Sequence, residues 1–165
     1  MDSLGVVMRV SLRRAMQGVG TLAALGASLL IGSQPAFASA NWQEFSTNAN
    51  WHCGDTKDVD PSGGAGVAAQ TCIVANSSGY AQQVVVVSNY AGYAVWIDAT
   101  IKERFGKLPT HNCNGSTLNS GFQRACFGQS VYVGCKGAFA MESFSDVQVS
   151  GSTTRTPSAF YRHYC

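Results

Sequence analysis

The side chains that could carry out hydrolysis are few, and they are spread along this sequence. The histidines are His52, His111 and His163, and the chain contains no Gly-x-Ser-x-Gly nucleophile elbow. Asp98 and Glu103 are carboxylates close enough in sequence to form an acid and base pair for glycoside hydrolysis. Acidic residues near a strand end are more often solvated. We therefore assign no catalytic residue and predict a protein that is not an enzyme.

A metal or phosphate cofactor has little support in the sequence. Asp55, Asp58 and Asp60 could hold calcium, but their spacing does not match the EF-hand loop, and a solvated acidic loop is the more common outcome. The run at residues 63–66 is rich in glycine but lacks the Lys-Ser/Thr of a phosphate-binding loop. We predict no metal and no cofactor.

The first 40 residues have the pattern of a secretory signal peptide. Arg9, Arg13 and Arg14 form a positive start, Val19–Ile31 is a run of small and apolar residues, and Ala36–Ala40 contains two overlapping Ala-x-Ala cleavage sites. The alternative is a membrane anchor, but the apolar run is shorter than the ~20 residues that a span needs. We expect a secreted, extracellular protein with no membrane span after the signal is removed.

The charge of the remaining chain is balanced. After residue 40, eight Lys and Arg residues stand against eight Asp and Glu residues, so the formal net charge of +2 comes from the first 40 residues. A chain without net positive charge lacks the electrostatic attraction that holds proteins on nucleic acid. We therefore expect no nucleic-acid partner.

The six cysteines all follow the predicted signal, and an even number in an exported chain indicates three disulfides. Six cysteines allow 15 pairings. Our working prediction pairs them in sequence order. The predicted bridges are Cys53–Cys72, Cys113–Cys126 and Cys135–Cys165.

Short segments of alternating or β-branched residues predict an all-β fold. Residues 80–88 contain four consecutive valines, residues 93–101 alternate between apolar and polar, and the turn-forming segment 89–92 predicts that they form a central β-hairpin. Further strands are expected at residues 67–75, 122–127, 130–135 and 138–150, the last of them broken near 143–146, with loops at 52–66 and 102–120.

Together these segments predict an antiparallel β-sandwich, or a small barrel, of six to eight short strands stapled by disulfides. We expect three parts in the chain, which are a signal peptide at 1–40, an aromatic segment and Gly-rich loop at 41–66, and a single β domain at 67–165.

Aromatic side chains are the candidates for binding. Trp42, Phe45 and Trp51 precede the predicted domain, and they either insert into a partner's cleft or, as is more common, cover this domain's own core. Tyr90 and Tyr93 flank a predicted turn, so we expect both to be exposed. The remaining aromatic residues could stack on sugar rings, form a protein interface or fill the core.

Several features resemble the small secreted, cysteine-containing β-proteins of Streptomyces-like actinobacteria. They are the leader ending at Ala36–Ala40, Cys72-Ile73-Val74, the valine run 84–87 and the segment Arg124–Gly128. Within that group the chain is similar to the small adaptor subunit of umbrella toxin particles. The resemblance implies a β-protein that joins a lectin-like subunit to a large toxin-bearing subunit, with residues 42–51 entering the lectin's cleft.

The sequence therefore predicts a secreted, non-enzymatic protein-binding module, an adaptor linking subunits of an extracellular antibacterial toxin complex. Two alternatives stay open at this point. One is a carbohydrate-binding or cell-wall-associated module, and the other is a small secreted hydrolase or protease inhibitor. If the adaptor prediction is right, deletion of residues 41–51 should abolish partner binding and leave the fold intact.

Overall fold

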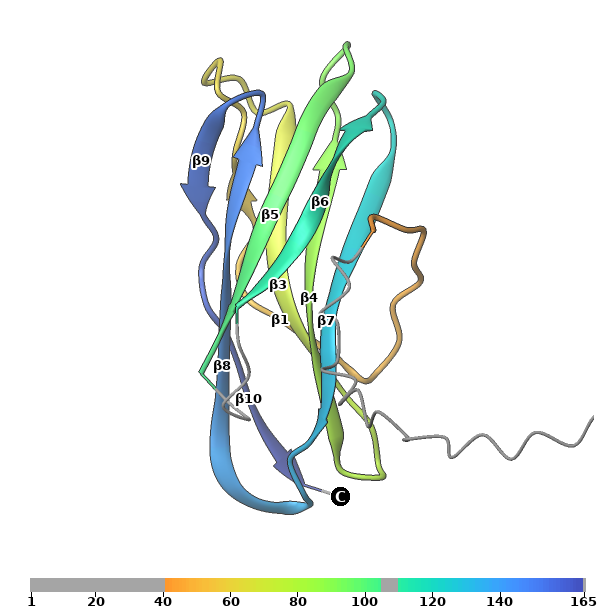
Figure 1. Ribbon diagram of the computed structural model, residues 1–165, viewed down its shortest axis with the longest axis vertical. Helices are drawn as coiled ribbons and strands as arrows, with labels where there is room; N and C mark the ends of the chain where they lie inside the picture. The colour runs from red at the N-terminus through yellow and green to blue at the C-terminus, as the bar shows by residue number, and fades with distance from the viewer. Residues whose placement is uncertain (1–40, 105–109, 165) are drawn as a thin grey trace, which may run out of the picture. The chain divides into compact units, whose positions relative to one another are not determined.

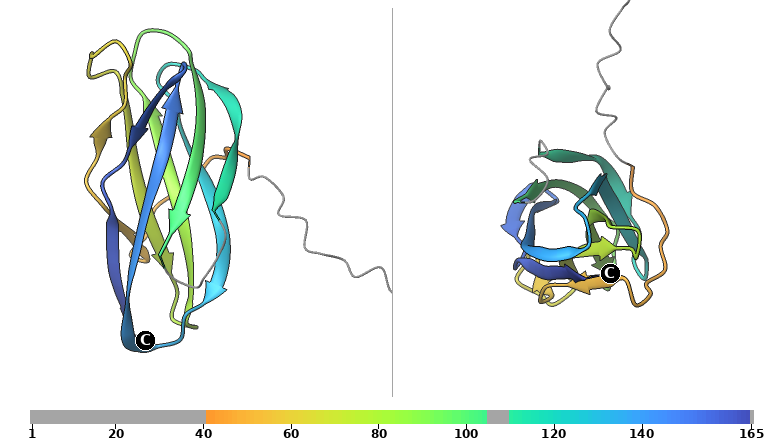
Figure 2. Two further views of the ribbon diagram at one scale, coloured as in Figure 1. Left: turned by 60° about the vertical axis from the view of Figure 1, so that its left-hand side comes forward. Right: turned by 90° about the horizontal axis from the view of Figure 1, so that it is seen from below.

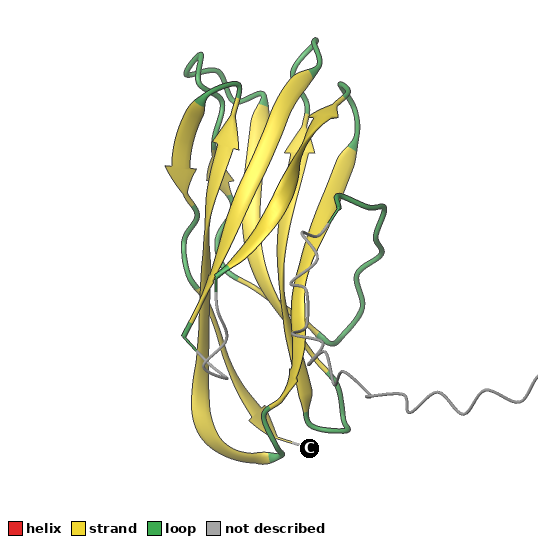
Figure 3. Cartoon of the chain, viewed as in Figure 1, coloured by secondary structure: helices red, strands yellow, loops and turns green. Residues whose placement is uncertain are grey.

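The predicted fold class is confirmed. The computed structural model describes residues 41–104 and 110–164, and these form ten strands in two antiparallel sheets that pack as a β-sandwich (Figures 1 and 3). No helix occurs in this described part of the chain. The predicted signal peptide at 1–40 lies outside the described residues.

The first sheet has the strand order β1-β3-β4-β7, and β2 pairs with β3 farther along the same edge as β1. β3 alternates buried and partly exposed residues along most of its length, whereas residues 83–87 of β4 are all buried because apolar side chains cover both faces there. The strands are β1 (Trp51–Cys53), β2 (Lys57–Asp58), β3 (Val67–Ala75), β4 (Tyr80–Asn89) and β7 (Gln123–Tyr132).

The second sheet has the order β10-β8-β5-β6, with β9 pairing with β8 beyond the end of β10. In both sheets, therefore, one edge position is divided between two short strands, which raises the strand number above the six to eight that we predicted. The strands are β5 (Val95–Glu103), β6 (His111–Leu118), β8 (Lys136–Val149), β9 (Ser152–Arg155) and β10 (Ala159–Tyr164).

The predicted central hairpin is wrong. The two segments are strands, but β4 lies in the first sheet and β5 in the second, so the turn at 89–94 crosses between the layers (Figure 2). The physical reason is that each strand carries a row of buried apolar residues on the face that points into the core. Val85 and Val87 of β4 share one buried cluster with Ile97 and Ile101 of β5, so the strands contribute to the same core from opposite sheets.

Two predicted loops contain strands, and two predicted breaks lie inside continuous strands. The predicted loop at 52–66 contains most of β1 and all of β2, and the predicted loop at 102–120 contains β6. The predicted break between the strands at 122–127 and 130–135 is instead a bulge inside one continuous strand, β7, where the register against β4 shifts between Gln82 and Val84. The predicted break at 143–146 is absent, since β8 runs unbroken through these described residues.

The space between the sheets is filled by two apolar clusters with polar side chains between them. The larger cluster includes Val87 and Ile97, and the smaller includes Ile73 and Met141. Thr71 of β3 hydrogen-bonds across the layers to Ser145 of β8 (2.8 Å between the hydroxyl oxygens). Buried hydroxyl groups that are paired in this way avoid the cost of desolvation and tie the sheets together.

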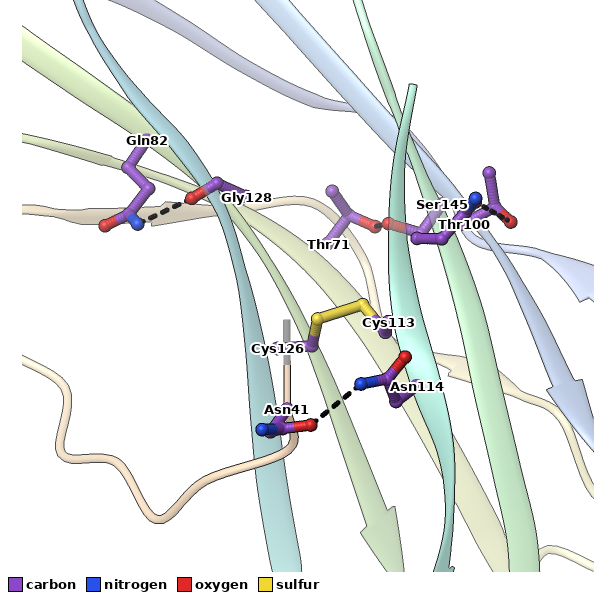
Figure 4. The surroundings of a disulfide bond; sticks show 10 residues. Asn41, Thr71, Gln82, Thr100, Cys113, Asn114, Cys126, Gly128 and Ser145 are labelled. Atoms are coloured by element: carbon purple, nitrogen blue, oxygen red, sulfur yellow. Dashed lines mark hydrogen bonds between the residues drawn. A yellow bond between two sulfur atoms is a disulfide. The ribbon is translucent and has the colours of Figure 1, made fainter. Parts of the chain in front are cut away.

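Two of the three predicted disulfides are confirmed. Cys53–Cys72 joins directly opposed residues of β1 and β3, and Cys113–Cys126 joins β6 of the second sheet to β7 of the first (Figure 4). The third predicted pair, Cys135–Cys165, includes residue 165, which lies outside the described residues. The bridge between β6 and β7 therefore links the two layers covalently at one side of the sandwich.

Candidate binding surfaces

The histidines do not gather into one constellation. His52 of β1 stacks on Tyr161 of β10, with ring centroids 3.4 Å apart, and His163 lies next to the same ring. Burial, reinforced by the charge of His163, lowers the pKa of His52. His111 belongs to β6, and its pKa is lowered by burial alone. His52 and His163 therefore lie beside Tyr161 where β1 meets β10, and the three histidines do not face a common substrate.

The carboxylates considered for catalysis are separated along a strand, and those considered for metal binding form no metal site in the described residues. Asp98 and Glu103 are five residues apart on β5, which corresponds to roughly 16 Å along a strand. That is farther than the ~5–9.5 Å between the paired carboxylates of glycosidases. Within the described residues, no group of three or more His, Cys, Asp or Glu side chains is arranged to hold a metal ion.

The acidic loop is organised by its own hydrogen bonds. The Asp60 carboxylate accepts hydrogen bonds from the Ser62 hydroxyl (2.7 Å) and the Ser62 backbone N–H (2.8 Å), which lower the pKa of Asp60. The Asp58 carboxylate accepts from the backbone N–H of Asp60 at 2.9 Å. These are local Asx-type contacts that shape a turn.

Ion pairs occupy the outer face of the second sheet. Asp146 on β8 is bound by Arg155 (2.8 Å) and by Lys102, and hydrogen bonding to Arg155 is the largest cause that lowers the Asp146 pKa to about 2. Both Arg104 and Arg155 also lie over the Phe144 ring. Arg104 also pairs with Glu142 at 3.0 Å, so each of these three cations is bound by a carboxylate on β8.

Residues 41–50 form a strap along the β6–β7 side of the sandwich, where the Cys113–Cys126 bridge also lies. Gln43 exchanges two backbone hydrogen bonds with Ala125, at 2.9 and 3.0 Å, so the strap pairs with the free edge of β7. Trp42 packs against the larger core cluster, and Asn41 accepts a hydrogen bond from Asn114 of the second sheet (Figure 4). The chain then passes back to β1, as Figure 2 shows.

Phe45 of the strap and Trp51 of β1 cover the outer face of the first sheet. Phe45 and Trp51 pack on a third apolar cluster there, and Trp51 lies between Phe45 (5.6 Å between centroids) and Phe127 (5.9 Å). The more common of our two interpretations, in which Trp42, Phe45 and Trp51 cover their own domain, therefore describes their positions. The domain includes residues 41–66 as well as 67–164.

Two connections that meet at one end of the sandwich carry three exposed aromatic residues. Tyr90 is 62% exposed, Tyr93 52% and Phe122 48%. The connection 89–94 carries the two tyrosines, and residues 119–122 carry Phe122. The connections are joined by backbone hydrogen bonds from Asn89 to Phe122 (2.9 Å) and from Gly121 to Asn89 (2.7 Å). We call Tyr90, Tyr93 and Phe122 the aromatic end.

Asn89 holds the aromatic end in place. Its side-chain amide is buried and donates to the carbonyls of Tyr93 and Leu118 (2.9 Å each), while its carbonyl oxygen accepts from the Ala91 N–H at 3.0 Å. A buried amide with these three partners fixes both connections against the ends of their strands. The sequence shows Asn89 only as a turn residue, because Leu118, the partner that joins the two connections, comes from a distant segment.

Other exposed aromatic residues lie elsewhere on the surface. Tyr80 and Tyr132 form an edge-to-face pair with centroids 5.3 Å apart. Trp96 lies over Gly115 on the outer face of the second sheet, where a Cβ atom on that glycine would overlap the ring. Phe160 and Tyr164 are exposed on β10.

A pocket of about 260 Å³ opens on the outer face of the first sheet between the strap and the aromatic end. Its lining combines aromatic rings, amides and hydroxyls with the Cys53–Cys72 disulfide, and it includes no charged residue among those described. The aromatic and polar lining residues are Phe45, Trp51, Tyr90, Thr47, Thr56, Gln70, Ser88 and Gln123. Sequence reasoning missed Gln70 and Gln123, because a glutamine on a strand carries no signal of its own.

Comparisons with protein families and with curated proteins find no match for this chain. In the residues that the structure describes, there is no helix of the length and apolarity needed to cross a membrane. Function must therefore be inferred from the surfaces described above.

Proposed function

We propose that this protein is a secreted, non-enzymatic protein-binding module that acts as an adaptor between subunits of an extracellular antibacterial toxin complex. The observation that supports a binding role most directly is the aromatic end. Tyrosine and phenylalanine side chains supply large contact areas and lose little side-chain entropy on binding. Loops at one end of a rigid β-sandwich are a common place for such a surface.

The two disulfides are compatible with this extracellular role. Disulfides form and persist in oxidising compartments, and here they brace a small domain at two places. A rigid scaffold lowers the entropy cost of ordering a binding surface, which favours tight association.

The insertion of Trp42, Phe45 and Trp51 into a partner's cleft stays a prediction. It requires the strap to leave the edge of β7 and expose the half-buried Trp42 ring, which costs apolar burial. The aromatic end needs no such rearrangement, because Tyr93 and Phe122 are already exposed. We therefore place the partner surface at the aromatic end.

The test is affinity purification from culture supernatant of two tagged proteins, the wild type and a double variant that carries Tyr93→Ala and Phe122→Ala. We expect the wild type to retain a lectin-like and a large toxin-bearing protein in stoichiometric amounts, and the double variant to lose at least one of them. Phe160→Ala is the control, because it removes an equally exposed ring from β10. Equal retention by all three proteins would contradict the proposed surface, and recovery of no partner would contradict the adaptor role.

A further inference from the structure

We propose that the pocket on the outer face of the first sheet binds a neutral saccharide unit. This site adjoins the protein-binding surface proposed above and shares Tyr90 with it. The inference rests on the chemistry of the pocket lining and not on the adaptor role.

The pocket has aromatic walls that are already in position. Trp51 is held between Phe45 and Phe127, and the Cys53–Cys72 disulfide beside it ties β1 to β3. Tyr90 also lines the pocket. A pyranose ring presents apolar C–H faces, which pack well on aromatic rings that are fixed before binding.

Neutral hydrogen-bonding groups complete the lining. The Gln70 Nε2 atom donates to the Gly54 carbonyl at 2.7 Å, and the Gln123 Nε2 atom donates to the Tyr90 hydroxyl at 2.7 Å. These bonds orient both amides at the pocket. Amides and hydroxyls can both donate and accept, which suits the hydroxyl groups of a sugar.

The charge of the site selects against ionic ligands. None of the described lining residues is charged, so a uronic acid or a phosphate would lose hydration without gaining an opposite charge. A sugar carrying only hydroxyl or N-acetyl groups pays no such penalty. The volume of about 260 Å³ is near the lower limit of small-molecule pockets, so we assign the pocket to one sugar unit of a chain.

The test is titration of the ¹⁵N-labelled protein with cellotriose, maltotriose, xylotriose and tri-N-acetylchitotriose, followed by NMR. We expect at least one neutral trisaccharide to shift the Trp51 indole signal and the side-chain amide signals of Gln70 and Gln123. Trigalacturonate, the anionic probe, should shift them far less.

Two pocket variants and one matched control make the test specific. Tyr90→Ala and Gln123→Leu should each raise the Kd of the binding trisaccharide about 5- to 10-fold, because each removes one ring contact or one hydrogen-bonding group. Tyr132→Ala removes an exposed tyrosine of β7 that lies outside the pocket and should leave that Kd unchanged.

Each contrary result would overturn the inference. These results are no shift with any neutral trisaccharide, shifts confined to residues outside the pocket, equal binding of trigalacturonate, or wild-type affinity in both pocket variants. Backbone NMR spectra of the variants show whether each one is folded. Because the adaptor test uses Tyr93 and Phe122, the two proposals can fail separately.

Discussion

Asp146 is the carboxylate whose ionised form the fold stabilises most clearly. Arg155 and Lys102 both contact it, its side chain is only 19% exposed, and its pKa falls from 3.8 to about 2. Because the folded-state pKa lies below the unfolded-state value, Asp146 contributes stability that is fully present above about pH 4. That contribution is lost as the pH falls through about 2.

This titration predicts a pH-dependent effect of Asp146→Asn. The variant should have a lower free energy of unfolding than the wild type at pH 7, and the difference should shrink as the pH falls from 4 to 2. Urea denaturation at a series of pH values measures it. The control is Asp55→Asn, at an exposed aspartate in the loop after β1. A difference that stays constant between pH 4 and pH 2 would contradict the role of these ion pairs.

Tyr90 and Tyr93 show that the local sequence around a single position can predict whether its side chain is exposed. Their place beside a predicted turn is enough to expect exposure, and both are more than half exposed. Phe122 is predicted as part of a strand and not of a surface, because its neighbours in space come from the 89–94 connection. Local sequence therefore identifies two members of the aromatic end but not the third.

At the scale of elements, the strap at residues 41–50 acts as part of the sandwich. Its backbone pairs with β7 at Gln43, and its Trp42 ring reaches the core between the sheets. By covering the edge of β7, the strap also protects backbone groups that could otherwise pair with another chain.

This packing predicts that Trp42→Ala destabilises the domain by about 2–3 kcal/mol, somewhat less than the loss of a fully buried tryptophan. Ser46→Ala, at an exposed position of the same strap, should change stability by less than about 0.5 kcal/mol. Chemical denaturation followed by circular dichroism compares them. Equal stability of the two variants would show that the strap is dispensable and free to enter a partner, as the resemblance implies.

The strands themselves were largely predictable, but their partners were not. Alternation in residues 93–101 and the valine run at 84–87 indicate strands because side chains on a strand alternate between two faces. The same pattern fits a hairpin within one sheet and two strands facing each other across a core. The second arrangement is formed because it buries Val85, Val87, Ile97 and Ile101 against one another.

At the scale of the whole molecule, two disulfides brace the sandwich in different ways. Cys53–Cys72 lies within one sheet, where β1 and β3 are already hydrogen-bonded, while Cys113–Cys126 connects the two sheets. Their sequence separations of 19 and 13 residues predict similar restriction of the unfolded chain.

Replacing both cysteines of either bridge with alanine should therefore lower the free energy of unfolding by about 3 kcal/mol. The two variants should differ in local stability. Loss of Cys113–Cys126 should speed amide hydrogen exchange in both sheets, whereas loss of Cys53–Cys72 should speed it near β1. Hydrogen exchange measured by mass spectrometry compares them, and identical patterns would contradict a distinct role for the bridge between the sheets.

Residue pattern alone determined that this chain is an all-β, disulfide-bonded protein, and the sequential pairing that we chose among 15 possibilities matched two of its bridges. Those features depend on local periodicity, on turn chemistry and on the order of a few cysteines. Only the tertiary structure decided which sheet each strand joins, that the strap belongs to the domain, and that Gln70, Gln123, Trp51 and Tyr90 line one pocket. These features depend on contacts between residues far apart in the chain, which form where the burial of apolar faces is greatest.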